Sequence, residues 1–266
     1  MIIICNGMMR SGSTLQYNIV KELLYQNKKK YAKLGYYNKD KIIQNFVDLE
    51  NYATDRSTIY LIKTHDFTKL NELDNVFVIY SYRNLLDVAA SLKRKFNSEG
   101  DGLILTINDN INNYYKIINS PKILIHSYKS LLNSLYNCVE ETSSFLKLET
   151  SNVILNEITL NNSPKNIIKL QNKKKVIKLI KKSILSSLTS TSSNTKKNIK
   201  SFFGVKVTNR LKHKLFPHDQ DSLLHLNHIS KDFGQNGNWE EILSDKEIKR
   251  IKSEFKNWTN ENKLEF

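Results

Sequence analysis

The first residues whose types and spacing could do chemistry are glycines and hydroxyl residues near the N-terminus. They run from Gly7 to Thr14 (GMMRSGST) and fit the phosphate-loop pattern G-x-x-x-x-G-S-T, with Ser13 at the usual lysine position. Such a loop points backbone N–H groups inward, and the helix after it adds about half a positive charge. The motif predicts a phosphate site with Arg10 as its cation, whereas the missing lysine disfavours an ATPase or a kinase. Alone, it could also be an ordinary Gly/Ser turn.

A second candidate site follows a run of β-branched and aromatic residues. Arg83 closes that run, and Ser91 lies eight residues later, about two helical turns away. An arginine at the carboxyl edge of a buried strand lies where open α/β folds bind ligands, and its guanidinium matches a phosphate. The alternative is that Arg83 only pairs with Asp87 at the start of a helix.

The third candidate site is Lys63-Thr64-His65, at the end of another predicted strand. A cation beside an imidazole could combine charge stabilisation with acid–base catalysis. The alternative is a solvated lysine next to a histidine that only packs.

The elements that must position these motifs alternate along the chain. Strands are predicted over residues 1–7, 59–62, 75–82 and 122–126, and helices over 15–24, 85–96, 109–118, 129–148 and 245–258. Ser244 and Glu247 predict a capping box for the last helix. This alternation predicts an α/β fold with three layers, in which a central parallel sheet is flanked by helices.

Composition narrows the class of protein. The chain has 266 residues, of which 39% are hydrophobic, so a packed core is expected. The two cysteines, Cys5 and Cys138, cannot form a disulfide framework, which favours a reducing compartment. No apolar run approaches the roughly 20 residues of a membrane span. We expect a soluble, cytoplasmic protein.

The net charge of +15 comes from one segment. Residues 165–214 contain 15 of the 41 Lys and Arg residues and no Asp or Glu, so the rest is balanced at 26 basic and 26 acidic residues. This predicts a single domain over 1–266 with a basic, partly helical insertion or lid at about 161–224. A solvated insertion, a lid over a bound anion and attachment to an anionic membrane are the alternatives for its role.

In combination and in this order, the motifs resemble those of the sulfotransferases that use 3′-phosphoadenosine 5′-phosphosulfate (PAPS). The match covers residues 1–148 and 225–258 and implies their P-loop-like fold. It implies that the loop residues Arg10, Ser11, Gly12, Ser13 and Thr14 bind the 5′-phosphosulfate, and that Leu15 is a further cofactor-binding position. It also implies that Arg83 and Ser91 bind the 3′-phosphate. His65 would then remove the acceptor proton, while Lys63 and Arg10 stabilise charge on the sulfonate.

The resemblance extends to the C-terminal part of the chain. Phe233, Gly234 and Gly237 match the family's C-terminal cofactor loop, and Tyr128 stands where the family has a segment near the adenine. Many cytosolic members have Lys at Arg10, Trp at Leu15 and an Arg-Lys pair where this chain has Asp232-Phe233. A lid formed by the basic segment, or Lys231, would supply the missing charge, which favours the lid.

These observations predict an enzyme that moves a sulfuryl group from PAPS to a hydroxyl or amine of a small-molecule acceptor, such as a metabolite, natural product or lipid. The product is 3′,5′-ADP, and no metal and no nucleic acid partner is expected. The acceptor pocket is expected to be built from loops, over residues 27–58, 97–108 and part of 161–224. The alternatives are a polyanion-binding protein that uses the basic segment, and an atypical P-loop kinase; the oligomeric state is not predicted.

Overall fold

The computed structural model describes residues 1–66, 69, 73, 75–169, 237 and 239–261. The chain divides into two compact units, one formed by Met1–Ser163 with Asn227–Phe266 and the other by Pro164–Leu226. All elements discussed below belong to the first unit. The predicted insertion or lid at 161–224 lies largely outside the described residues and stays a prediction.

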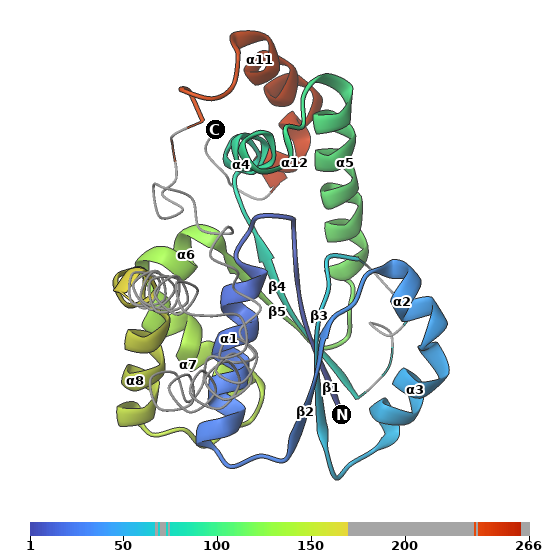
Figure 1. Cartoon of the computed structure of the whole chain (residues 1–266), viewed down its shortest axis with the longest axis vertical. Coiled ribbons are helices and arrows are strands. Elements are labelled where there is room, and N and C mark those ends of the chain that lie inside the picture. Colours follow the sequence, from blue (N-terminus) through green and yellow to red (C-terminus); the bar gives the residue numbers. More distant parts are fainter. Residues whose placement is uncertain (67–68, 70–72, 74, 170–236, 238, 262–266) are drawn as a thin grey trace, which may run out of the picture. The chain divides into compact units, whose positions relative to one another are not determined.

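A five-stranded sheet forms the centre of the first unit (Figure 1). Its strands are β1 (Ile2–Gly7), β2 (Tyr31–Tyr36), β3 (Ile59–Lys63), β4 (Val76–Tyr82) and β5 (Ile123–Ser127), in the order β2-β3-β1-β4-β5. Each neighbouring pair is parallel. The parallel α/β sheet predicted from the alternating pattern is therefore confirmed.

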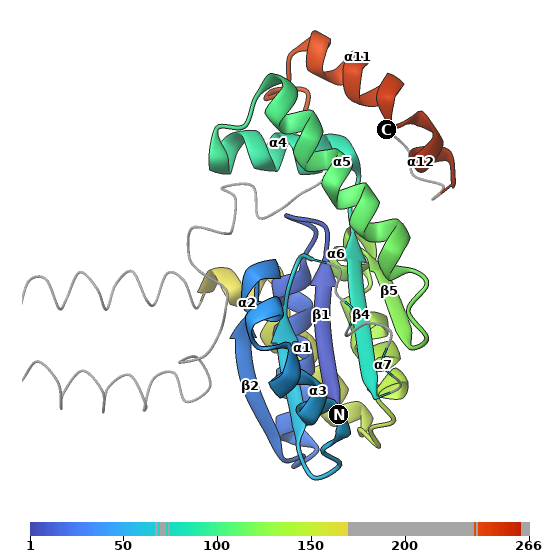
Figure 2. The same ribbon diagram turned by 90° about the vertical axis from the view of Figure 1, so that its right-hand side faces the viewer.

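Helices cover both faces of this sheet (Figures 1 and 2). One face carries α1 (Ser13–Gln26), α6 (Tyr128–Asn133), α7 (Leu135–Phe145) and α8 (Asn152–Asn162), and the other carries α2 (Lys39–Gln44), α3 (Phe46–Thr54) and α5 (Gly100–Ile117). Beyond the carboxyl ends of the strands lie α4 (Leu85–Phe96), α11 (Asp245–Glu254) and α12 (Lys256–Glu261). The three-layer arrangement is confirmed.

The central strand, β1, explains why the three motifs meet. Its residues are all buried, and apolar β-branched side chains such as Ile2 and Ile4 favour a strand with both faces covered. In the register, Cys5 pairs with Lys63 of β3, and Gly7 pairs with Ser81 of β4. The segments after β3, β1 and β4 therefore leave the sheet side by side, at the edge where open α/β folds bind ligands.

Several element boundaries differ from the prediction. Residues 27–58, expected as loops, contain β2, α2 and α3, because the edge strand YAKLGY is only partly buried and lacks a clear alternating pattern. The predicted helix 109–118 begins earlier, at Gly100, where two glycines obscure the helical signal. The helices predicted over 129–148 and 245–258 are each interrupted, at Ser134 and Phe255. The capping box of Ser244 is confirmed.

Candidate active site

The phosphate loop joins the end of β1 to the start of α1. Gly12 is the N-cap of α1 with φ 98°, in the left-handed region that favours glycine. A Cβ on Gly12 would lie 3.0 Å from the Tyr128 ring, and one on Gly7 would lie 2.3 Å from the Ser81 hydroxyl. Both glycines are therefore required by close approach. Because the first amides of a helix lack partners within it, those of Ser13 and Thr14 suit a phosphate.

Two residues of the loop shape it through contacts inside the protein. The Ser11 hydroxyl oxygen lies 2.7 Å from the Met8 carbonyl oxygen and 2.8 Å from the Ser81 carbonyl oxygen, and its proton can be donated to either. These contacts hold the loop against β4. Leu15 packs against the apolar cluster formed by α1, α6, α7 and α8. Both side chains thus serve the loop's conformation, and neither contact assigns them a role toward the nucleotide.

Arg10, Arg83 and Ser91 form a single cluster, in which Arg83 and Ser91 are buried and Arg10 is half-buried. Arg10 has a positive φ of 70°. Its Nε donates to the Ser91 Oγ at 2.8 Å, and its carbonyl accepts from Arg83 Nη1 at 3.4 Å. Arg83 and Ser91 are each only 5% exposed. The structure therefore brings the loop cation to the residues predicted for the 3′-phosphate.

The electrostatics of this cluster suit an anion. Burial, followed by the positive charge of Arg83, lowers the pKa of Arg10. Burial also lowers the pKa of Arg83, whose guanidinium lies 4.2 Å from the centre of the Tyr128 ring. Two neighbouring buried cations repel each other, and a bound phosphate relieves that repulsion. Tyr128 therefore lies beside both the loop and Arg83.

Lys63 and His65 stand together at the end of β3. The Lys63 Nζ lies 3.1 Å from His65 Nε2, and His65 Nδ1 lies 2.7 Å from the Gly7 carbonyl. Because a carbonyl oxygen can only accept, Nδ1 carries the proton and Nε2 has the lone pair of a base. The Gly7 carbonyl thus links the histidine to the phosphate loop.

The surroundings of Lys63 adjust its charge. Burial lowers the pKa of the Lys63 ammonium to about 8. The ammonium also lies 5.0 Å from the centre of the Tyr36 ring, which is 6.0 Å from the ring of His65. Tyr36 is 43% exposed and lies at the end of β2. It borders the candidate base from the side of residues 27–58, where acceptor contacts were expected.

Two asparagines of α5 contact the phosphate loop and the segment after β3, and they were not identified from the sequence. Asn110 Oδ1 accepts from the Met9 backbone N–H at 3.0 Å, and Asn113 Nδ2 donates to the His65 carbonyl at 3.3 Å. They lie three residues apart on one face of the helix, so a single helix supports both loops. Two asparagines three residues apart within the apolar pattern of α5 could have indicated buried polar contacts. Asparagine is common throughout this chain, so their presence did not stand out.

The C-terminal cofactor loop is described only in part. Phe233 and Gly234 lie outside the described residues, as does Lys231, so their predicted roles stay predictions. Gly237 has φ 100°, and its backbone N–H donates to Asp87 Oδ1 at 2.9 Å. The structure therefore brings Gly237 to α4, the helix that carries Ser91.

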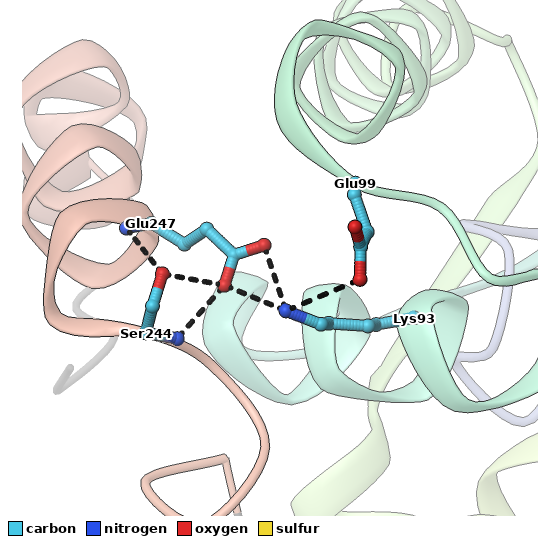
Figure 3. Close-up of polar contacts among 4 residues, drawn as sticks. All are labelled: Lys93, Glu99, Ser244 and Glu247. Carbon is cyan, nitrogen blue, oxygen red and sulfur yellow. Dashed lines mark hydrogen bonds and ion pairs between the residues drawn. The ribbon is translucent and has the colours of Figure 1, made fainter.

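A second attachment holds the following helix, α11, to α4 (Figure 3). The Lys93 Nζ donates to both carboxylate oxygens of Glu247 at 3.0 Å and lies 3.7 Å from the Glu99 carboxylate. The same Glu247 accepts from the Ser244 backbone N–H at 2.8 Å, within the capping box. One glutamate thus caps α11 and also fixes it to α4.

Comparison with known proteins identifies the fold. No protein-family model and no curated protein matches the chain. Among solved structures, mouse sulfotransferase SULT7A1 complexed with PAP superposes with a TM-score of 0.58 at 12% identity, covering 96% of this chain and 85% of that one. Retinol dehydratase in a complex with retinol and PAP gives 0.57 at 15% identity, covering 100% of this chain and 83% of that one.

A further retinol dehydratase structure, with androsterone and the inactive cofactor PAP, gives a TM-score of 0.54 at 14% identity, covering 100% of this chain and 82% of that one. The chain therefore has the fold of the PAPS-dependent sulfotransferases. Within the described residues, no cluster of three or more His, Cys, Asp or Glu residues could hold a metal ion. No helix in that same part of the chain is long and apolar enough to span a membrane.

Proposed function

We propose that this protein is a sulfotransferase that moves a sulfuryl group from PAPS to a hydroxyl or amine of a small molecule. The observation that carries the proposal is that two cationic motifs meet beside a phosphate loop that has a cation of its own, Arg10. Lys63 ends β3, and Arg10 and Arg83 follow the adjacent strands β1 and β4. These cations are joined through Ser91, His65 and backbone carbonyls. The fold provides independent support.

The donor would be held at two separate anion sites. The amides of Ser13 and Thr14 and the α1 N-terminus would bind the 5′-phosphosulfate. Arg83 and Ser91, both buried, would bind the 3′-phosphate, with Tyr128 beside the adenine. Gly12 supports this assignment, because a side chain at this position would approach the Tyr128 ring and narrow the space between the phosphate loop and Tyr128.

The residues near His65 would then carry out the proton transfer. PAPS supplies the sulfuryl group, and its 5′-phosphate leaves as the new oxygen–sulfur or nitrogen–sulfur bond forms. His65 Nε2 takes the acceptor proton, since Nδ1 is held by the Gly7 carbonyl. For this to happen, the Lys63 ammonium turns from Nε2 toward the sulfonate, where its charge stabilises the departing oxygen.

The acceptor is proposed to be a small, partly apolar molecule. Tyr36 gives the edge beside His65 an exposed aromatic ring, which favours an apolar body near the reacting group. Retinol and androsterone, seen in the retinol dehydratase complexes, are alcohols of this kind. We further propose that the enzyme works in the cytoplasm, with 3′,5′-ADP as its product, and without a metal or a nucleic acid partner.

The two alternatives have less support. An atypical P-loop kinase lacks the phosphate-loop lysine, because Ser13 occupies that position. A polyanion-binding protein would use the basic segment, which lies almost entirely outside the described residues, and would leave the Lys63–His65 pair without a role.

A thermal-shift panel tests the proposal. The protein is heated with PAPS, 3′,5′-ADP, ATP or NAD, each at the same concentration. We expect the first two to raise the melting temperature and the others to do so much less, because only they carry a 3′-phosphate beside a 5′-phosphate. Stabilisation by ATP alone would instead support the kinase.

A further inference from the structure

Asp87 is a buried carboxylate whose two oxygens have different partners. It is only 4% exposed, and it lies near the start of α4. Its Oδ2 lies 3.7 Å from Arg83 Nε, and its Oδ1 accepts the Gly237 N–H at 2.9 Å. A carboxylate so well removed from water is costly unless its charge and hydrogen-bonding capacity are matched. Arg83 matches the charge of the Asp87 carboxylate, and the Gly237 N–H uses part of its hydrogen-bonding capacity.

The two partners belong to segments that are far apart in the sequence. Arg83 precedes α4, whereas Gly237 begins the described part of the C-terminal segment. The positive φ of Gly237, 100°, is readily adopted only by glycine, and in this conformation its N–H meets the Asp87 carboxylate. Asp87 thus connects the cation predicted for the 3′-phosphate with the predicted C-terminal cofactor loop.

The other contacts of the C-terminal segment lie farther along the chain. Glu247 contacts Lys93, which follows Ser91 on α4 (Figure 3), and Arg250 donates to Asp101 of α5 at 2.6 Å. These ion pairs fix α11 rather than the glycine segment. Among the described residues, Asp87 provides the contact that joins Gly237 to the Arg83 region.

We propose that Asp87 is a positioning residue that holds Gly237 against the nucleotide site, an inference that rests on the proposed function. The carboxylate fixes the Gly237 backbone through Oδ1 and balances part of the Arg83 charge through Oδ2. Loss of its oxygens would release Gly237 and weaken nucleotide binding, although Asp87 itself need not touch the nucleotide. Loss of the charge alone would leave the Gly237 hydrogen bond in place, because an asparagine Oδ1 still accepts.

The test compares Asp87→Ala with the conservative Asp87→Asn. Hydrogen exchange at the Gly237 amide is followed by mass spectrometry with fragmentation that resolves single amides, and 3′,5′-ADP affinity is measured by calorimetry. We expect Asp87→Ala to speed Gly237 exchange and to weaken 3′,5′-ADP by about tenfold, the loss of one buried hydrogen bond. Asp87→Asn should keep exchange slow and affinity within about threefold of the wild type.

Lys93→Met is the matched control, because it breaks the α11 attachment without touching Asp87 or Gly237. Lys93→Met should leave hydrogen exchange at the Gly237 amide as slow as in the wild type. Should Asp87→Ala fail to fold, wild-type exchange and Asp87→Asn still decide the matter. A Gly237 amide that exchanges freely in the wild type, or an asparagine variant that loses tenfold in affinity, would overturn the inference.

Failure of the proposed function would look different. A wild-type protein that binds no 3′,5′-ADP while Asp87→Ala still frees the Gly237 amide would refute the sulfotransferase assignment and the nucleotide part of this inference. The structural attachment of Gly237 by Asp87 would be supported by the same result.

Discussion

The two halves of the candidate site differ in how firmly the protein holds them. On the donor side, Arg83 and Ser91 are 5% exposed and are linked to the phosphate loop by hydrogen bonds. On the base side, His65 is only partly buried, and the neighbouring Tyr36 is 43% exposed. The proposed donor side is therefore buried, whereas His65 and Tyr36 on the proposed base side are partly exposed.

This difference has a functional meaning. A buried donor site would hold phosphates in fixed positions and strengthen their interaction with the cations there. A partly exposed base side would let the acceptor approach His65, and the proposed mechanism needs the Lys63 ammonium to turn away from His65 Nε2. One side would therefore determine which donor binds, and the other would determine which acceptor reacts. Substitutions on the two sides should separate affinity from turnover.

The largest expected effect is on the base side. His65→Ala should lower kcat by roughly 10²–10⁴-fold, because it removes the general base. It should leave 3′,5′-ADP affinity nearly unchanged, since Arg83 and Ser91 keep their hydrogen bonds to Arg10. Steady-state kinetics with PAPS and a reactive acceptor, together with calorimetry, would measure both. Turnover within about threefold of the wild type would assign the proton transfer to another group.

On the donor side, Arg83→Ala should weaken 3′,5′-ADP by roughly 10- to 100-fold, the loss of a charged hydrogen bond to phosphate. Affinity for 5′-AMP should barely change, because that nucleotide has no 3′-phosphate. Arg56→Ala is the matched control, since Arg56 is an exposed arginine in the turn before β3. Calorimetric titration of all three proteins tests this, and an equal loss for both nucleotides would contradict the assignment of Arg83.

The pH dependence should report the charge of Lys63. Burial lowers the pKa of this ammonium to about 8, so the free enzyme loses the cation above that pH. We expect kcat/KM for PAPS to fall as the pH rises through about 8, approaching tenfold per pH unit. Lys63→Arg keeps its charge in this range and should remove the alkaline fall. A wild-type profile that stays flat to pH 9.5 would argue against a catalytic charge on Lys63.

The smallest effect is expected at the C-terminal attachment shown in Figure 3. Glu247→Gln weakens the partly exposed ion pair with Lys93, so the free energy of unfolding should fall by about 1 kcal/mol or less. Nucleotide affinity and kcat should stay unchanged, because Glu247 contacts neither half of the site. Chemical denaturation and calorimetry provide the two measurements. A loss of affinity would show that α11 itself shapes the donor site.

The donor side could be predicted from the sequence because its motifs are local. Each consists of a strand end and the few residues after it, and a parallel sheet brings strand ends together. The pattern around Gly7 and Arg83 therefore predicted which residues would lie close together. The hydrogen bond from Arg10 Nε to Ser91 Oγ was not predicted, because the direction of the Arg10 side chain depends on the positive φ of that residue.

The supporting residues could not be predicted for a physical reason. Asn110 and Asn113 lie on a helix whose apolar positions show only that it packs, and their partners belong to distant loops. The contact of Asp87 with Gly237 joins residues 150 positions apart and has no local signature. The strand β2, which carries Tyr36, was not predicted, because it is only partly buried and follows a run of lysines in the sequence. Long-range contacts determined all of these features.

Calorimetric titration of the wild-type protein with 3′,5′-ADP and with 5′-AMP tests the central claim most directly. The donor site is proposed to hold a 3′-phosphate at Arg83 and Ser91, separately from the phosphate loop. We therefore expect 3′,5′-ADP to bind roughly 10- to 100-fold more tightly than 5′-AMP, with the advantage lost in Arg83→Ala. Equal affinities of the wild type for the two nucleotides would contradict the account.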